Sequence, residues 1–179
     1  MKLNTGALEV VDSAPTLNSQ FTLMINIKKA TIEDVAKIAD IYKSWLNFKD
    51  VLPEKLCEPE NPEDIKRNIK NGRIYLLAEV DGEPAGVNYI DTTFKALECI
   101  RLGDFIVKDD HRNKGVGSAL IDKTIKYAKE NKMKKIWLWT QEELTDAIKL
   151  YEKKSFIFEG KQKSQFCGKD ALLYGLVLE

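Results

Sequence analysis

The chain has 179 residues, 44% of them hydrophobic and 31% charged, which is typical of a folded globular protein and not of a disordered one. Its 28 basic and 28 acidic side chains cancel, which argues against a general electrostatic grip on nucleic acid. One histidine and three widely spaced cysteines without a CxxC pair argue against a metal site, so we expect free thiols. No apolar run approaches the roughly 18 residues that span a bilayer. We therefore expect a cytoplasmic protein without membrane contacts.

The first third of the chain is predicted to hold an extension, a strand and two helices. Residues 1–23 are small and polar, which indicates a flexible extension or an added leader before a single domain over 24–179. Residues 25–31 alternate between apolar and polar, as a half-buried strand does. The apolar side chains of 32–46 fall on one side of a helix of about four turns. A second helix begins at Pro62, behind an asparagine cap.

The rest of the chain alternates between strands and helices. Residues 73–92 read as a hairpin around the Asp81-Gly82 turn. The later elements are a strand over 97–107, a helix over 115–131, a strand over 134–140, a helix over 145–156 and a closing strand over 171–179. The order β-α-α-β-β-β-α-β-α-β predicts an α+β, or mixed α/β, fold around one sheet.

The segment "HRNKGVGSAL" (111–120) places two glycines at the start of a predicted helix, where glycine needs a reason. A helix N-terminus offers unpaired backbone N–H groups and partial positive charge to an anion. Arg112 and Lys114 add charge there, and Gly115 and Gly117 let a ligand approach the backbone. The spacing fits neither the Walker nor the dinucleotide-binding pattern. The alternative is a glycine-rich helix entry used only for close packing.

A second segment, "AIKLYEKKSF" (147–156), lies about 35 residues downstream. Together, "RNKGVGSAL" and this segment resemble the acyl-CoA loop, R/Q-x-x-G-x-G/A, and the A-x-x-L-Y-x-K-x-G-F segment of the GNAT superfamily of acyl-CoA-dependent N-acyltransferases. The resemblance covers roughly residues 25–178. It implies the GNAT fold, a central and mostly antiparallel sheet that is splayed at the acyl-CoA site and has helices on both faces.

The resemblance also implies that acetyl-coenzyme A is the co-substrate. Its pyrophosphate would lie on the backbone N–H groups of 113–118, with Arg112 bracing the loop. Its pantetheine arm would run as an extra strand beside the end of the strand over 97–107. The coenzyme contacts implied in this way are Phe105, Ile106, Val107, Arg112, Asn113, Lys114, Gly115, Val116, Gly117 and Ser118.

Two residues are candidates for catalysis. By resemblance, Tyr151 is the general acid that serves the departing thiolate; the alternative is a core aromatic side chain. Asp104 is the best carboxylate candidate for the base, and Glu98 and Asp91 are the next candidates. The alternative for each is a surface charge. A base that acts through ordered water is equally open. The lone histidine, His111, is expected to point to solvent.

The resemblance predicts direct transfer of an acetyl group, in a ternary complex, to a primary amine on a small molecule, a peptide or a protein. A homodimer is one option for the assembly. An acyl-CoA-binding sensor without turnover, or an acyltransferase with another donor, remains open. Two departures from the family pattern stand out: Ser155 replaces a glycine before the final Phe, and Leu144 replaces an asparagine that often contacts the coenzyme arm.

Overall fold

The computed structural model describes residues 23–49, 52–53, 55 and 58–179. Apart from Leu23, the extension expected over 1–23 lies outside these residues, and so does Cys57. Of the cysteines that are described, Cys99 and Cys167 are free thiols. No helix within the described residues is long and apolar enough to cross a membrane.

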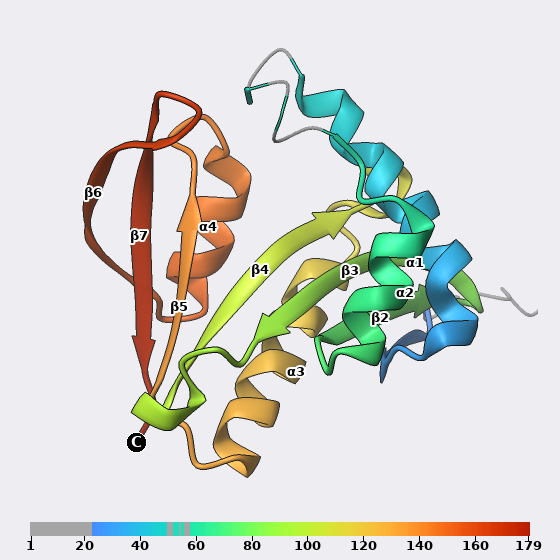
Figure 1. The fold of residues 1–179 in the computed structure, drawn as a ribbon, viewed down its shortest axis with the longest axis horizontal. Coiled ribbons are helices and arrows are strands. Elements are labelled where there is room, and N and C mark those ends of the chain that lie inside the picture. The colour runs from blue at the N-terminus through green and yellow to red at the C-terminus, as the bar shows by residue number, and fades with distance from the viewer. Residues whose placement is uncertain (1–22, 50–51, 54, 56–57) are drawn as a thin grey trace, which may run out of the picture.

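The fold is an α+β arrangement around one sheet, as expected (Figure 1). Among the described residues the sheet has seven strands in the order β1-β2-β3-β4-β5-β7-β6. All neighbouring pairs are antiparallel except β4 and β5, which are parallel. The strands are β1 (Ile25–Lys29), β2 (Ile74–Val80), β3 (Glu83–Asp91), β4 (Cys99–Val107), β5 (Lys135–Thr140), β6 (Ile157–Phe166) and β7 (Lys169–Val177).

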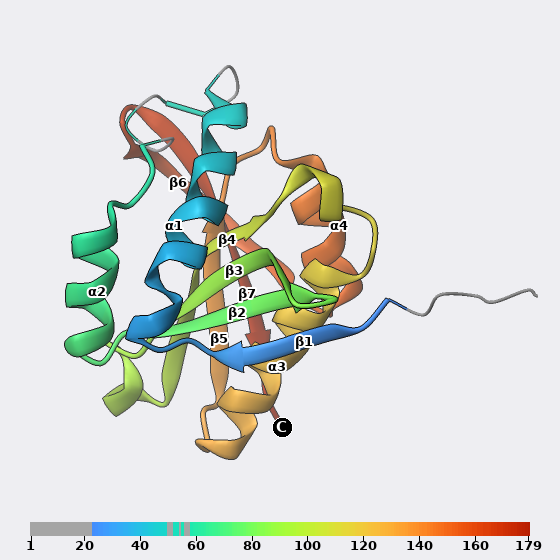
Figure 2. The ribbon, with the colours of Figure 1, turned by 90° about the vertical axis from the view of Figure 1, so that its right-hand side faces the viewer.

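Helices cover both faces of the sheet (Figure 2). They are α1 (Val35–Tyr42), α2 (Pro62–Lys70), α3 (Val116–Glu130) and α4 (Thr145–Lys153). One buried cluster joins α1 and α2 to side chains of β2, β3 and β4, and a second joins α3 and α4 to the opposite face. The two clusters give the sheet an α1/α2 face and an α3/α4 face.

Local signals in the sequence are confirmed at several element ends. Asn61 caps α2, because its Oδ1 accepts a hydrogen bond from the Asp64 N–H at 2.9 Å. The β2–β3 turn has positive φ at both Asp81 (51°) and Gly82 (91°), as a tight hairpin turn requires. The helix expected over 32–46 is helical, but only α1 is regular, with 3-10 turns before and after it.

Two strands follow α4, whereas the expected order counted one. The omitted strand, β6, is an edge strand whose side chains are almost all exposed. Its sequence "IFEGKQKSQF" is dominated by polar residues and lacks a buried alternating face. Hydrophobic periodicity cannot identify a strand that is held mainly by its backbone ladder to β7.

The parallel strands β4 and β5 stay together over only three residue pairs. Cys99, Ile100 and Arg101 pair with Lys135, Ile136 and Trp137, and beyond that point the strands diverge (Figure 1). The splay expected from the family resemblance is therefore present. On the other side of β4, the register to β3 shifts between Val87 and Tyr89, which leaves Asp104 in a left-handed conformation with φ 41°.

Candidate active site

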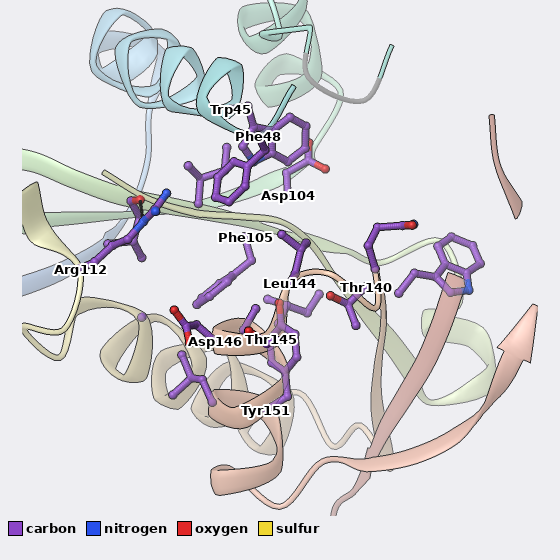
Figure 3. A pocket seen from close by; sticks show the side chains of 18 of the residues that line it. Trp45, Phe48, Asp104, Phe105, Arg112, Thr140, Leu144, Thr145, Asp146 and Tyr151 are labelled. Atoms are coloured by element: carbon purple, nitrogen blue, oxygen red, sulfur yellow. Dashed lines mark hydrogen bonds between the residues drawn. The ribbon is translucent and has the colours of Figure 1, made fainter. Parts of the chain in front are cut away.

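A cavity of about 700 Å³ lies where β4 and β5 part. Its walls come from the second half of β4, the loop before α3, the end of β5, α4, and the 3-10 turn over Lys43–Phe48 that follows α1. Figure 3 shows Trp45, Phe48 and Asp104 on one side of it and Phe105, Leu144 and Tyr151 on the other. The gap in the sheet is thus a hollow that side chains from both faces reach.

The glycine-rich loop forms one end of this cavity. Gly115 is the N-cap of α3 with φ 88°, and Asn113 is left-handed as well, with φ 60°. The first N–H groups of α3 have no partner inside the helix. Arg112, Asn113, Gly115, Gly117 and Ser118 line the cavity. The other two predicted loop contacts do not line it with their side chains, since Lys114 is exposed and Val116 is buried in the core.

Gly117 also has a packing reason to be a glycine. A Cβ at this position would lie 3.0 Å from Leu150 Cδ2 and 3.1 Å from Phe105 Cζ. Close packing, the alternative explanation of the glycines, therefore accounts for Gly117 on its own. Gly115 differs, because its backbone conformation strains any L-residue and the nearest side-chain atom, Ile25 Cδ1, is 3.6 Å away from a built Cβ.

The three predicted contacts on β4 all line the cavity but face different ways. Phe105 packs toward α4, with its ring 5.8 Å from the ring of Tyr151. Ile106 is buried in the α1/α2 cluster. The backbone carbonyl of Val107 accepts a long hydrogen bond of 3.4 Å from Arg112 Nε, which ties the loop to the strand. Because these side chains turn to the two faces of the sheet, the part of β4 that borders the gap itself is its backbone edge.

Tyr151 lines the cavity from the α3/α4 face. It is buried, and its ring also contacts Phe156 and Tyr174. Its hydroxyl makes no hydrogen bond to any described residue. Burial raises the pKa of Tyr151 well above that of a free tyrosine, so the hydroxyl keeps its proton at neutral pH. The side chain is at once a core aromatic and a cavity residue with an available O–H.

Asp104 reaches the same cavity from the α1/α2 face (Figure 3). The Tyr42 hydroxyl donates a 2.8 Å hydrogen bond to Asp104 Oδ2. Burial raises the pKa of Asp104 to about 6, against the opposing effect of the Tyr42 hydrogen bond. A carboxyl with such a pKa can both lose and accept a proton near neutrality.

The other carboxylates named from the sequence do not share this setting. Burial favours a higher pKa for Asp91, but hydrogen bonds from Thr93 and Arg101 outweigh burial and lower the pKa of this carboxyl. Glu98 is exposed in a left-handed turn and does not line the cavity. The expectation that His111 points to solvent is wrong: its side chain is 15% exposed and lines the cavity, because the 3-10 turn over Asp109–His111 carries it back toward the loop.

Sequence reasoning missed much of the cavity wall. Trp45 lines it from the turn after α1, and Phe166 lines it from the omitted strand β6. The signal for Trp45 was its position at the end of an amphipathic helix, whereas no pattern in the sequence pointed to Phe166. Phe48, in the segment after that helix that was expected to form part of the wall of the acceptor pocket, does line the cavity. Of the tryptophan pair on β5, whose rings are 4.7 Å apart, only Trp139 lines the cavity.

Leu144 lines the cavity at the position where the resembling family has an asparagine. It precedes α4 and lies close to Thr140 in the view of Figure 3. An aliphatic side chain there cannot hydrogen-bond to a ligand, so any polar contact must come from elsewhere. Within the described residues, no group of three or more histidine, cysteine or acidic side chains could hold a metal ion.

Comparisons with known proteins identify the family and the fold. Residues 37–156 match the model of the acetyltransferase (GNAT) family. An uncharacterized N-acetyltransferase of Methanocaldococcus jannaschii is 33% identical over 86 residues, which are 46% of this chain and 38% of that relative, so the chain matches well under half of the relative's length.

Solved structures share the fold. The PaiA N-acetyltransferase of Thermoplasma acidophilum in complex with coenzyme A has a TM-score of 0.73 at 18% identity, covering 87% of this chain and 99% of that one. The ribosomal-protein-S18-alanine N-acetyltransferase of Escherichia coli has a TM-score of 0.70 at 18% identity, covering 87% and 95%. The solved structures agree in fold, and because the family model matches more than half of the chain, the chain belongs to the acetyltransferase (GNAT) family.

Proposed function

We propose that this protein transfers the acetyl group of acetyl-coenzyme A directly to a primary amine in a ternary complex. One observation carries the proposal. The cavity between β4 and β5 has a helix N-terminus at one end, and it receives Asp104 and Tyr151 from opposite faces of the sheet. An anionic carrier, a proton acceptor and a proton donor can therefore meet in one place.

The residues at the loop fit the diphosphate of the coenzyme. The first N–H groups of α3 and the helix dipole favour an anion there, and the left-handed residues Asn113 and Gly115 shape the turn before the helix. Arg112 adds a cation, although Asp109 already pairs with it at 2.6 Å. We assign the diphosphate mainly to the backbone, with side-chain charge as a smaller contribution.

The free edge of β4 fits an extended arm with amide groups. After Arg101 no strand among the described residues pairs with this edge, so its backbone groups on the β5 side are available to a ligand. The apolar side chains of Phe105, Leu144 and Leu150 line the same stretch of the cavity. These features suit a narrow chain with both amide and methylene groups.

When bound, acetyl-coenzyme A supplies the thioester whose C–S bond breaks as the new C–N bond forms. Asp104 would take the proton that the acceptor amine loses, directly or through a water molecule. Tyr151 would hydrogen-bond to the departing sulfur and supply its proton. Because the two side chains approach from opposite faces, the acceptor would enter from the α1/α2 face and the coenzyme from the α3/α4 face.

The proposal is tested by thiol release from acetyl-coenzyme A over a panel of primary amines. We expect acceptor-dependent release, and a loss of about tenfold to a hundredfold in Tyr151→Phe with coenzyme affinity retained. Tyr127→Phe, on α3 and outside the cavity lining, is the matched control and should keep full activity. Tight binding of acetyl-coenzyme A without turnover on any amine would favour a sensor; absence of binding would refute the assignment of the loop.

A further inference from the structure

Arg101 is a cavity residue on the same face of β4 as Asp104, and the proposed mechanism does not use it. Its side chain is 21% exposed. The guanidinium is held in place by its neighbours: Nε and Nη2 donate to Asp91 Oδ2 at 3.2 and 2.9 Å, and Nη2 also donates to the Tyr89 hydroxyl. The guanidinium carbon also lies 5.2 Å from the ring centroid of Trp139.

The third guanidinium nitrogen, Nη1, donates to no described residue. A planar guanidinium fixed by a carboxylate and stacked against an aromatic ring has lost most of its freedom, so another hydrogen bond from it carries little entropic cost. The arrangement is that of a donor prepared for an oxygen atom in the adjoining cavity.

We infer that Arg101 is a specificity-determining residue that binds a carbonyl or carboxylate oxygen of the acceptor while the acceptor's amine faces Asp104. The preferred acceptor is then an α-amine, as in an amino-acid amide or the N-terminus of a peptide, and not an isolated alkylamine. This inference rests on the proposed function and narrows its acceptor class.

The acid–base setting of Asp104 supports the same class of acceptor. Its pKa is about 6. An α-amine loses its proton near pH ~7.8 and a lysine-like amine near ~10.4. The α-amine is thus much closer to Asp104 in proton affinity, which makes removal of its proton by this carboxyl less costly.

The competing explanation is that Arg101 is only a structural cross-strand partner of Asp91. Arg73 provides a matched control, since it pairs with Glu60 at 3.3 Å and stacks on Tyr89 with a distance of 4.5 Å to the ring centroid. Arg73 does not line the cavity. If Arg101 has only a structural role, replacing either arginine should have the same effect on acceptor preference. If Arg101 binds the acceptor, only its replacement should change that preference.

The test compares acceptors that differ by one carboxamide group beside the amine: phenylalaninamide with phenethylamine, and alaninamide with ethylamine. In the wild-type protein we expect kcat/KM to be about tenfold or more higher for the amides, because a hydrogen bond to a charged donor is lost in the alkylamines. Arg101→Met should lower this preference about tenfold by raising KM for the amides, with unchanged affinity for coenzyme A, while the part that comes from the lower pKa of the α-amine remains. Arg73→Met should keep the full preference.

A preference that is absent in the wild type, or that is as large in Arg101→Met as in the wild type, would overturn the inference while leaving the acetyltransferase proposal intact. So would a wild-type protein that acetylates neither amide while binding acetyl-coenzyme A and acetylating other amines. Failure to bind acetyl-coenzyme A would instead contradict the proposed function itself. Thermal unfolding of both variants identifies any loss of fold.

Discussion

The two walls of the cavity are built in different ways. The wall that we propose for the coenzyme consists of the start of α3, Phe105 and Tyr151, and its main parts lie in two short sequence motifs. We call it the coenzyme wall, and we call the opposite side, proposed for the acceptor, the acceptor wall. The acceptor wall combines Asp104 and Arg101 with Trp45 from the turn after α1 and Trp139 from β5. It has no contiguous motif.

The strand β4 explains why both walls meet. The neighbouring side chains of Asp104 and Phe105 point to opposite faces, toward the acceptor wall and the coenzyme wall. The left-handed backbone at Asp104 interrupts the regular alternation and puts its side chain on the same face as Arg101, three residues earlier. The irregular register opposite β3 and the missing partner beyond Arg101 expose both side chains to the cavity. In the proposed mechanism one wall would bind the coenzyme, which is the same for every acceptor, and the other would bind the acceptor.

The largest expected effect is at the acceptor wall. Asp104→Asn should lower kcat by about 10²–10⁴-fold, because the amide cannot accept the amine's proton. Asparagine tolerates the left-handed conformation at this position. A matching loss in Tyr42→Phe would show that the hydrogen bond, and not the carboxyl itself, is what matters.

The stability of Asp104→Asn relative to the wild type should rise between about pH 4 and pH 6. The folded-state pKa of Asp104 is raised from 3.8 to about 6, so its charged form is disfavoured in the folded protein. The wild type therefore loses stability relative to Asp104→Asn as pH rises from about 4 to 6, by up to about 3 kcal/mol. Urea unfolding at pH 4 and pH 8 measures this difference; equal gaps at both values would contradict it.

The pH profile of the wild type follows from the same group. Because Asp104 must be ionised to act as a base, kcat/KM should fall about tenfold per pH unit below pH 6. Tyr42→Phe removes a hydrogen bond that lowers this pKa, so its acid limb should move to higher pH. If the acid limb of the Tyr42→Phe profile lies at the same pH as in the wild type, Asp104 is not the group that titrates in the rate-limiting proton transfer.

A smaller effect is expected at the coenzyme wall. Gly115→Ala forces a Cβ into a left-handed backbone, at a cost of about 1 kcal/mol, and should weaken coenzyme A binding about tenfold as the loop shifts. Gly82→Ala is the control, since its φ of 91° is nearly the same but it lies in the β2–β3 turn. Calorimetry should find that both variants lose stability and that only Gly115→Ala loses affinity.

The smallest effect concerns a departure from the family motif. Ser155 is left-handed with φ 66°, in the turn between α4 and β6. Ser155→Gly relieves this strain, partly offset by the greater freedom of glycine in the unfolded chain, and should stabilise the protein by about 0.5 kcal/mol. Thermal unfolding would detect the gain, and coenzyme affinity should not change.

The sequence by itself determined the features that depend on neighbours along the chain. The β2–β3 turn, the caps of α2 and α3 and most of the helices follow from local preferences and hydrophobic period. The two motifs at 111–120 and 147–156 indicated the GNAT fold through their resemblance to that family. The edge strand β6 was not predicted because almost all of its side chains are exposed and it has no buried hydrophobic face.

The sequence named Asp104 as a candidate base, but only the tertiary structure decided which residues surround it. The hydrogen bond from Tyr42 to Asp104 joins residues 62 positions apart, and the burial that raises the pKa of this carboxyl comes from elements distant in sequence. His111 likewise turned inward against expectation. The physical reason is that burial and strand divergence are properties of long-range packing, whereas turns and caps are set within a few residues.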